Sequence, residues 1–160
     1  DLVALRIVNL LSRTGFSFSP ATILSTHKEL FTGVFDQLIP VGKFRKTNIT
    51  KDEPVLFGAT VIYSDYTMIQ TTLDYDFQPE KQFSYQGLAK EEMISHIQSF
   101  IFSIWQIHPF HEGNTRTVTF FLNKYLRESS FTIDNQPFHE SVLYLRDALV
   151  LDNCQNLIPK

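Results

Sequence analysis

Residues 108–117 read His-Pro-Phe-His-Glu-Gly-Asn-Thr-Arg-Thr and combine a base, a carboxylate, a glycine, an amide and a cation in one short stretch. The run follows an apolar segment with helical spacing and leads into another at 118–126, so Gly113 and Asn114 fall where a new helix begins. Free backbone N–H groups and the positive end of the helix dipole meet at such a start, and both favour an anion. The stretch therefore predicts a phosphate-binding turn between two helices.

Each polar residue of this stretch has a chemical interpretation and an ordinary structural alternative. His108 could accept a proton from an incoming hydroxyl, or be a satisfied core histidine. Glu112 could bind Mg²⁺, or be a solvated acid at a helix start. Asn114 could bind a phosphate oxygen or cap the helix, while Arg116 suits phosphate oxygens or simply lies on the surface. Gly113 lets the backbone approach a phosphate, or only makes a turn. Their joint occurrence favours handling of a nucleotide triphosphate.

Length and composition indicate one domain over residues 1–160. Hydrophobic residues make up 43% and charged residues 19%, which is typical of a globular chain, and fifteen phenylalanines predict an aromatic-rich core. The net charge of -3 argues against a broad nucleic-acid surface, so no nucleic-acid partner is expected. The single cysteine, Cys154, fits a reducing, cytoplasmic compartment and is not expected to be a nucleophile.

The sequence predicts no membrane partner. No run approaches the roughly 20 apolar residues that span a bilayer. The opening stretch, residues 2–11, carries Arg6 and Asn9 and lacks the cleavage site of a secretory signal, so an amphipathic helix is the better interpretation.

The periodicity predicts helices joined by one β interruption. Helices are expected at 2–12, 20–31 with Ser19 as its cap, 65–75, 88–107, 114–126 and 137–154. In the fourth of them, Ile94, Ile97, Ile101 and Ile104 recur on one face, and the spacing extends this buried stripe to His108. The last is expected to face inward through Leu143, Leu149 and Val150. Two β-branched and aromatic segments, 44–49 and 55–63, flank a turn at 51–54 and predict a hairpin.

The stretch at 108–116 resembles the signature of the Fic family, which runs His-x-Phe-x-Asp/Glu-Gly-Asn-Gly/Lys-Arg. The matching positions are His108, Phe110, Glu112, Gly113, Asn114 and Arg116. A second set of residues resembles the family's region around its β-hairpin flap: His27, Leu30, Phe31, Gly42, Arg45, Asn48, Ile49, Lys51 and Phe57. The similarity covers about Thr22 to Arg127.

The resemblance implies a mainly α-helical Fic fold, a helical bundle with a β-hairpin flap. It implies transfer of AMP from ATP to a Ser, Thr or Tyr hydroxyl of a target protein, with ATP and Mg²⁺ as cofactors. His108 would be the base and Glu112 the Mg²⁺ ligand. The phosphates would be bound by Gly113, Asn114, Thr115 and Arg116. The target would dock on the flap at Asn48, Ile49, Thr50, Lys51 and Phe57.

Two positions depart from the family pattern. Thr115 stands where AMP-transferring members have Gly and where the kinase-type Doc branch has Lys, so its Cβ could crowd the β-phosphate. Thr119 stands where many members carry a second Arg that pairs with an inhibitory Glu, and the inhibitory motif itself has no match. The enzyme is therefore expected to be unregulated, attenuated or held by a separate antitoxin.

Three other interpretations remain open. One is Doc-like phosphoryl transfer, or transfer of another nucleotide or phosphodiester. Another is a catalytically attenuated, toxin-type binding module. The third is a zinc hydrolase that uses His108, His111, Glu112 and His139, although Pro109 interrupts the helix that would align such ligands. His111 is otherwise expected to be a surface or target-facing residue.

Overall fold

The computed structural model describes residues 1–57, 60–129, 131–132 and 146–151, and this part of the chain is mainly helical. Its α-helices are α1 (Leu2–Ser12), α2 (Pro20–Phe31), α3 (Ile69–Gln82), α4 (Lys90–Ile107) and α5 (Asn114–Glu128). Residues 146–151 are also helical. Between α2 and α3 the chain forms an antiparallel pair of strands, β1 (Thr50–Asp52) and β2 (Thr60–Ile62), and two short 3-10 turns, η1 (Pro54–Leu56) and η2 (Tyr66–Met68).

Local chemistry explains where the helices begin and end. Ser19 caps α2 by accepting from the N–H of Thr22 at 3.3 Å, and Pro20 occupies the first turn, as the sequence predicts. The Glu92 carboxylate reaches back to the N–H of Ala89 at 2.8 Å and satisfies a free donor at the start of α4. Pro109 prevents α4 from continuing past the turn at its end.

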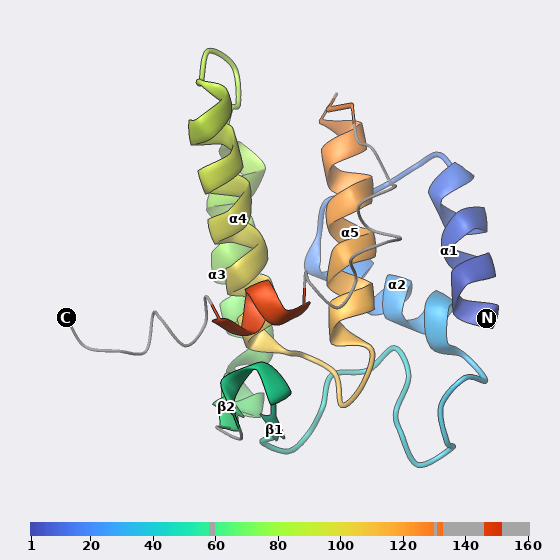
Figure 1. Ribbon diagram of the computed structural model, residues 1–160. Coiled ribbons are helices and arrows are strands. Elements are labelled where there is room, and N and C mark those ends of the chain that lie inside the picture. Colours follow the sequence, from blue (N-terminus) through green and yellow to red (C-terminus); the bar gives the residue numbers. More distant parts are fainter. Residues whose placement is uncertain (58–59, 130, 133–145, 152–160) are drawn as a thin grey trace.

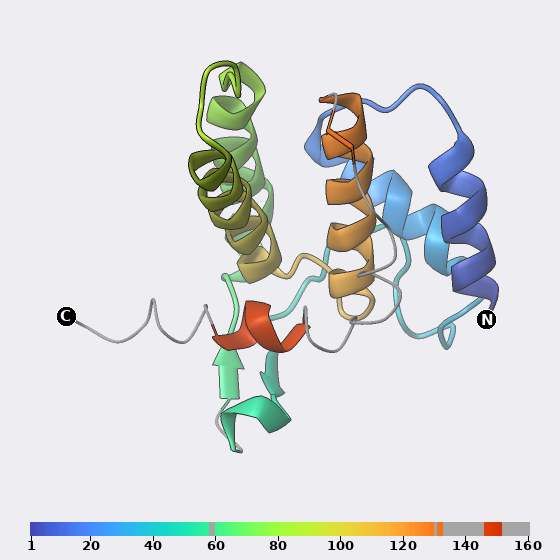
Figure 2. The ribbon, with the colours of Figure 1, turned by 45° about the horizontal axis from the view of Figure 1, so that its top comes forward.

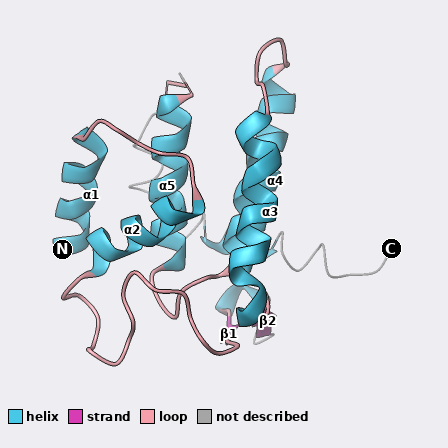
Figure 3. Cartoon of the chain, turned by 180° about the vertical axis from the view of Figure 1, so that it is seen from behind, coloured by secondary structure: helices cyan, strands magenta, loops and turns pink. Residues whose placement is uncertain are grey.

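The helices form two groups with α5 between them (Figure 1). On one side α3 and α4 run side by side in opposite directions, and on the other side lie α1 and α2, as the view from behind also shows (Figure 3). The hairpin lies below the C-terminal end of α4, next to the helical residues 146–151 (Figure 2). The start of α5, the end of α4 and the hairpin therefore meet at one end of the molecule.

The core is rich in aromatic side chains, which confirms that expectation. Phe18 packs between helices, with ring centroids 4.7 Å from Phe77 of α3 and 4.6 Å from Tyr125 of α5. Phe121 of α5 contacts Phe77 at 5.5 Å. A second cluster joins α1 and α2 to α5 through Val3, Leu30, Phe31 and Phe120. Because α5 supplies side chains to both clusters, the helix is held in position from two sides.

The hairpin exists, but the predicted strand at 44–49 is wrong. Phe44 and Ile49 pack against the core from a loop, and the N–H of Arg45 donates to the carbonyl of Pro109 at 2.9 Å rather than to a strand. The second predicted strand, 55–63, is also too long, since Pro54 starts η1 and Phe57 adopts a left-handed backbone at φ 55°. The β-branched and aromatic residues reflect burial here rather than strand pairing.

Two helix predictions also need correction, and a third is confirmed over the residues that the structure describes. The helix predicted at 65–75 is η2 followed by α3, which continues to Gln82 with Pro79 inside it. The predicted buried stripe of α4 holds for Ile101 and Ile104 and partly for Ile97, whereas Ile94 is exposed. Of the helix predicted at 137–154, residues 146–151 are helical and Leu149 and Val150 are buried, as predicted. Leu143 and Cys154 lie outside the described residues.

Within the described ranges, no helix is both long and apolar enough to cross a membrane.

Candidate active site

His108 follows directly after the last residue of α4 and turns the chain out of the helix. Its backbone is left-handed, with φ 49° and ψ 61°, a conformation that is strained for a residue with a Cβ. The ring is buried, with only 3% of the residue exposed, and stacks on Tyr63 at a centroid distance of 3.7 Å. Trp105 meets the ring edge-on at 5.2 Å. The imidazole is therefore fixed between aromatic side chains at the end of the helix.

The surroundings of His108 keep its imidazole neutral. Burial lowers its pKa to about 3, assisted by the nearby charges of Lys51, Arg45 and Arg146. Nδ1 lies 3.2 Å from the carbonyl oxygen of Trp105, which can only accept, so Nδ1 carries the proton. Nε2 then holds the lone pair, and no hydrogen bond to Nε2 exists among the residues that the structure describes. This tautomer is the one a proton acceptor needs.

Arg45 holds the turn after α4 against the root of the hairpin. Its side chain is buried, with 2% of the residue exposed, and burial lowers its pKa. The guanidinium donates to four carbonyl oxygens, those of His108 (2.8 Å), Thr47 (2.7 Å), Ile107 (3.2 Å) and Ser64. These bonds explain how the chain can leave the helix at His108 without losing its geometry.

His27 of α2 supports the next part of the loop. Its Nδ1 accepts from the N–H of Gly42 at 2.9 Å, so Nε2 carries the proton and donates to the carbonyl of Glu112, also at 2.9 Å. The ring stacks on Phe110 with centroids 3.8 Å apart, and burial lowers its pKa. A neutral His27 thus joins α2, the segment before the hairpin and the loop before α5.

The turn into α5 is tight and leaves backbone N–H groups pointing out of the helix. Gly113 has φ 80°, and an added Cβ would lie 2.6 Å from the ring of Phe31. The Asn114 side chain accepts from the N–H of Phe110 at 2.9 Å and donates to its carbonyl at 2.7 Å. Asn114 therefore braces the loop, and the N-cap position is Gly113 rather than Asn114. The amide groups of the first turn have no intrahelical acceptor and suit an anion.

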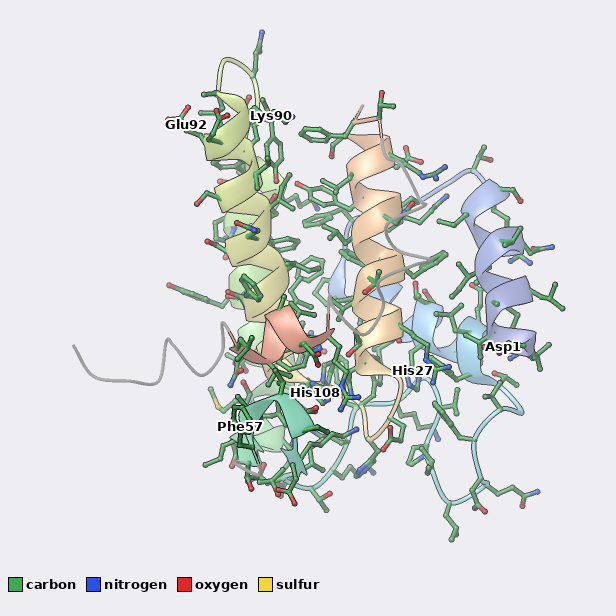
Figure 4. The ribbon with its side chains drawn as sticks, in the orientation of Figure 1. Asp1, His27, Phe57, Lys90, Glu92 and His108 are labelled. Carbon is green, nitrogen blue, oxygen red and sulfur yellow. The ribbon has the colours of Figure 1, made fainter. Side chains whose placement is uncertain are left out.

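Glu112 and Arg116 supply charge on either side of this turn. The Glu112 side chain is 49% exposed, and both of its oxygens lie 3.2 Å from Nζ of Lys51 on β1. Arg116 is exposed and its guanidinium lies 4.7 Å from the centroid of Phe31. One accessible carboxylate next to an anion-binding turn fits Mg²⁺, which takes one or two protein carboxylates together with phosphate oxygens. The candidate site thus brings a neutral imidazole, an accessible carboxylate and a helix N-terminus together, and Figure 4 labels two of the histidines around it, His27 and His108.

Residues 17–126 match the model of the Fic/DOC family. The chain belongs to this family. The match includes the whole signature stretch at 108–116, here called the Fic motif, and the hairpin of β1 and β2. It ends before the helical residues 146–151. A comparison with proteins of curated function finds no match.

Solved Fic domains of Bartonella effectors share this fold. BepC from Bartonella tribocorum, crystallised with AMPPNP, is 21% identical with a TM-score of 0.66, over 84% of this chain and 67% of that one. A VirB-translocated Bep effector from Bartonella quintana with bound ADP is 24% identical with a TM-score of 0.64, over 83% and 65%. The effector BepA is 24% identical with a TM-score of 0.64, and this chain spans 48% of it.

The two threonines that depart from the Fic motif have different surroundings. The hydroxyl of Thr115 accepts from Nε1 of Trp105 at 3.1 Å, so it ties the first turn of α5 to α4. Thr119 lies one helical turn later and is half-buried. Trp105 also contacts His108, and Thr115 therefore supports the imidazole of His108 through the indole ring.

The predicted flap residues divide into a root and a tip. At the root, Asn48 donates to Asp65 at 2.9 Å and accepts from the N–H of Tyr66 at 2.8 Å, while Ile49 packs on the core. Thr50 and Lys51 lie on β1, and the Lys51 ammonium reaches Glu112 of the Fic motif. Phe57 lies fully exposed at the far end of the hairpin (Figure 4).

Several supporting residues had no predicted role, although the family resemblance included some of them. His27, Phe31 and Arg45 all match the family, and each proves to be buried against the loop of the Fic motif. Glu53 was not singled out: it is buried and pairs with Arg146 from the helical segment 146–151. A charged residue next to a hairpin turn gives no sequence signal of burial, because its partner lies far along the chain.

The zinc alternative finds no support within the described part of the chain. No group of three or more His, Cys, Asp or Glu side chains there is placed to bind a metal. His111 is half-buried beside Glu112, and His139 lies outside the described residues.

Proposed function

We propose that this Fic domain is a protein adenylyltransferase that moves AMP from ATP to a Ser, Thr or Tyr hydroxyl of a target protein. The observation that carries the proposal is the neutral His108, whose Nδ1 is engaged by the Trp105 carbonyl and whose Nε2 is left to accept a proton. It lies one loop away from the first turn of α5, where a triphosphate would bind.

In the proposed reaction the target hydroxyl oxygen attacks the α-phosphorus of ATP. The bond from that phosphorus to the pyrophosphate oxygen breaks, pyrophosphate leaves, and the hydroxyl proton passes to Nε2 of His108. A positioned base of this kind contributes about 10²–10⁴-fold to a rate. Stacking on Tyr63 at 3.7 Å holds the ring in place and reduces the cost of orienting it.

The phosphates would lie on the first turn of α5. The backbone N–H groups of Gly113, Asn114 and Thr115 point out of the helix, and Arg116 supplies a fork of donors. Glu112 would hold Mg²⁺ on the other side of the turn. The chemistry that bound Mg²⁺ supplies is neutralisation of the charge that develops on the pyrophosphate. Asn114 acts by keeping the loop in shape, since its amide is bonded to the backbone of Phe110.

The target protein would dock on the outer edge of β1. The outer side of β2 already bonds to α4, because Gln106 donates from its side chain to the Ile62 carbonyl at 3.0 Å. An extended segment can add to a free strand edge by main-chain hydrogen bonds. The exposed ring of Phe57 would contact the same segment near the tip.

Thr115 is the observation that keeps kinase-type transfer as a second candidate. It is neither the Gly of AMP-transferring members nor the Lys of the Doc branch, and its hydroxyl is used by Trp105. The pose of the triphosphate at this position decides which phosphorus faces the hydroxyl. Because Thr119 replaces the second Arg, the family's inhibitory Glu–Arg pair cannot form here. Inhibition of the enzyme would then need a separate protein such as an antitoxin.

Parallel reactions with α-labelled and γ-labelled ATP in lysate distinguish the candidates. Label on protein from the α-phosphate alone is the expected result. Label from the γ-phosphate alone would show kinase chemistry and overturn the proposal. Absence of label from both, together with absence of Mg-nucleotide binding, would indicate the non-enzymatic binding module.

A further inference from the structure

Two ion pairs of opposite polarity hold β1, one from Lys51 in the middle of the strand and one from Glu53, the residue that follows it. Lys51 on β1 reaches Glu112 of the Fic motif, with Nζ 3.2 Å from both carboxylate oxygens. Glu53, which follows β1, pairs with Arg146 of the helical segment 146–151. The second pair is the more buried, since the Glu53 side chain is 3% exposed whereas that of Glu112 is 49% exposed. The Lys51 pair is therefore the one that can open without unpacking the core.

Other contacts attach β2 firmly to α4. The side chain of Gln106 donates to the Ile62 carbonyl at 3.0 Å, and Tyr63 stacks on His108. At the centre of the hairpin, Val61 of β2 is buried in the main core, whereas Lys51, which pairs with it on β1, is only half-buried. In the hairpin, β2 is therefore fixed to α4. Within the described residues, β1 contacts the Fic motif through the Lys51 ammonium.

The position of this ammonium matters because Glu112 is the carboxylate that a divalent cation would need. An ammonium equidistant from both oxygens occupies the directions from which a metal ion would bind. Two cations on one carboxylate repel each other, and the Lys51 side chain is only 29% exposed, so water does not fully screen them. Metal and Lys51 therefore exclude each other at Glu112.

We propose that Lys51 is a tethered cation that competes with a divalent metal–nucleotide complex for Glu112. This inference rests on the proposed function, in which Glu112 is the metal ligand. Loading the nucleotide releases Lys51 and frees the edge of β1, so the metal–nucleotide complex binds first and the target segment second. Without nucleotide, the Lys51 pair keeps the flap closed on the motif.

Binding of Mg²⁺ with α,β-methylene-ATP, which cannot transfer AMP, tests the competition by calorimetry. Lys51→Gln is expected to tighten binding about two- to fivefold, the range set by a partly exposed ion pair. Lys51→Arg, which keeps the cation, is expected to retain the wild-type affinity. Lys46→Gln serves as the matched control, because Lys46 is an exposed lysine in the loop before β1. Equal or weaker binding by Lys51→Gln would overturn the proposal.

Hydrogen exchange at residues 50–52 gives an independent readout. In the wild type, exchange is expected to rise when the metal–nucleotide complex is added. In Lys51→Gln it is expected to be fast from the start and unchanged by nucleotide. Exchange that is equally slow in the nucleotide-free wild type and in Lys51→Gln would overturn the proposal that the Lys51–Glu112 pair holds β1 against the Fic motif. Failure of the proposed function has another signature, in which no variant binds the nucleotide although Lys51→Gln still speeds exchange.

Discussion

Two buried ionisable groups next to α4 have different hydrogen-bonding environments: Glu80, which contacts His96 of α4, and His108, which ends the helix. Glu80 of α3, 5% exposed, accepts from the hydroxyls of Tyr85 at 2.6 Å and Tyr125 at 2.5 Å, and lies 2.5 Å from Nε2 of His96. His108, 3% exposed, uses one nitrogen for the Trp105 carbonyl and leaves the other unbonded within the described residues. Both groups are buried, but each oxygen of Glu80 has a partner, whereas Nε2 of His108 has none among the described residues.

This difference indicates a structural role for Glu80 and leaves His108 available for chemistry. Burial and the Glu80 carboxylate raise the pKa of Tyr125 to about 12 and raise that of Tyr85 further, so both hydroxyls remain donors. Glu80 thereby ties α3 to α5 and, through His96, to α4. A buried polar group with all its partners stabilises a fold, whereas one with a partner missing costs stability and is available for chemistry.

The largest expected effect is the loss of AMP transfer when His108 is replaced. Replacing His108 by Asn removes the base while keeping a residue that tolerates the left-handed backbone at φ 49°. Transfer of α-label should fall about 10²–10⁴-fold. His111→Asn, a change in the same loop, should leave most of the transfer intact. Undiminished labelling by His108→Asn would remove His108 from the role of base.

The next largest effect is the loss of stability when Glu80 is replaced. Glu80→Ala leaves two tyrosine hydroxyls and an imidazole without their acceptor, and should cost about 3 kcal/mol of unfolding free energy in urea. Glu91→Ala removes an exposed carboxylate from the first turn of α4 and should cost well under about 1 kcal/mol. Label transfer per folded molecule should stay unchanged in both. A small loss for Glu80→Ala would mean that Glu80 has no structural role.

His108 should dominate the dependence of stability on pH near neutrality. The pKa of His108 is about 3 in the folded chain, below its value of about 6.5 when unfolded, so the unfolded chain binds the proton more readily. Stability should therefore fall as pH drops below about 6.5, by about 1 kcal/mol between pH 6.5 and 5.5 for this group.

Urea unfolding at these two pH values measures the slope. His108→Asn should reduce it without removing it, because burial also lowers the pKa of His27. His111→Asn is again the control. A slope that is the same in His108→Asn and the wild type would contradict the assignment of this pH dependence to His108.

The smallest expected effect concerns the link between α4 and α5. Thr115→Val keeps the shape of the side chain but leaves Nε1 of Trp105 without its acceptor, at a cost of about 1 kcal/mol. Trp105 is the single tryptophan of the chain, so its fluorescence should shift in the folded state. An unchanged spectrum would mean that the hydroxyl does not support the indole ring.

Local signals were enough for many elements of the fold. Ser19 and Pro20 predicted the start of α2, Pro109 the end of α4, and the combination of Gly113 and Asn114 the start of α5. The strand prediction failed at residues 44–49. There the Arg45 side chain donates to the carbonyls of His108, after α4, and Ser64, before η2. No local pattern reveals such bonds, because the acceptors lie far along the chain. Burial of Glu53 was missed for the same reason.

The sequence by itself determined the family and the chemical groups of the Fic motif, because their identities and spacing lie within one short stretch. Tertiary structure decided how those groups are used. Burial between Tyr63 and Trp105 makes His108 neutral, His27 of α2 binds the carbonyl of Glu112, and Lys51 lies against the Glu112 carboxylate. Each of these depends on contacts between residues distant in the chain or on desolvation, and neither is encoded in local spacing.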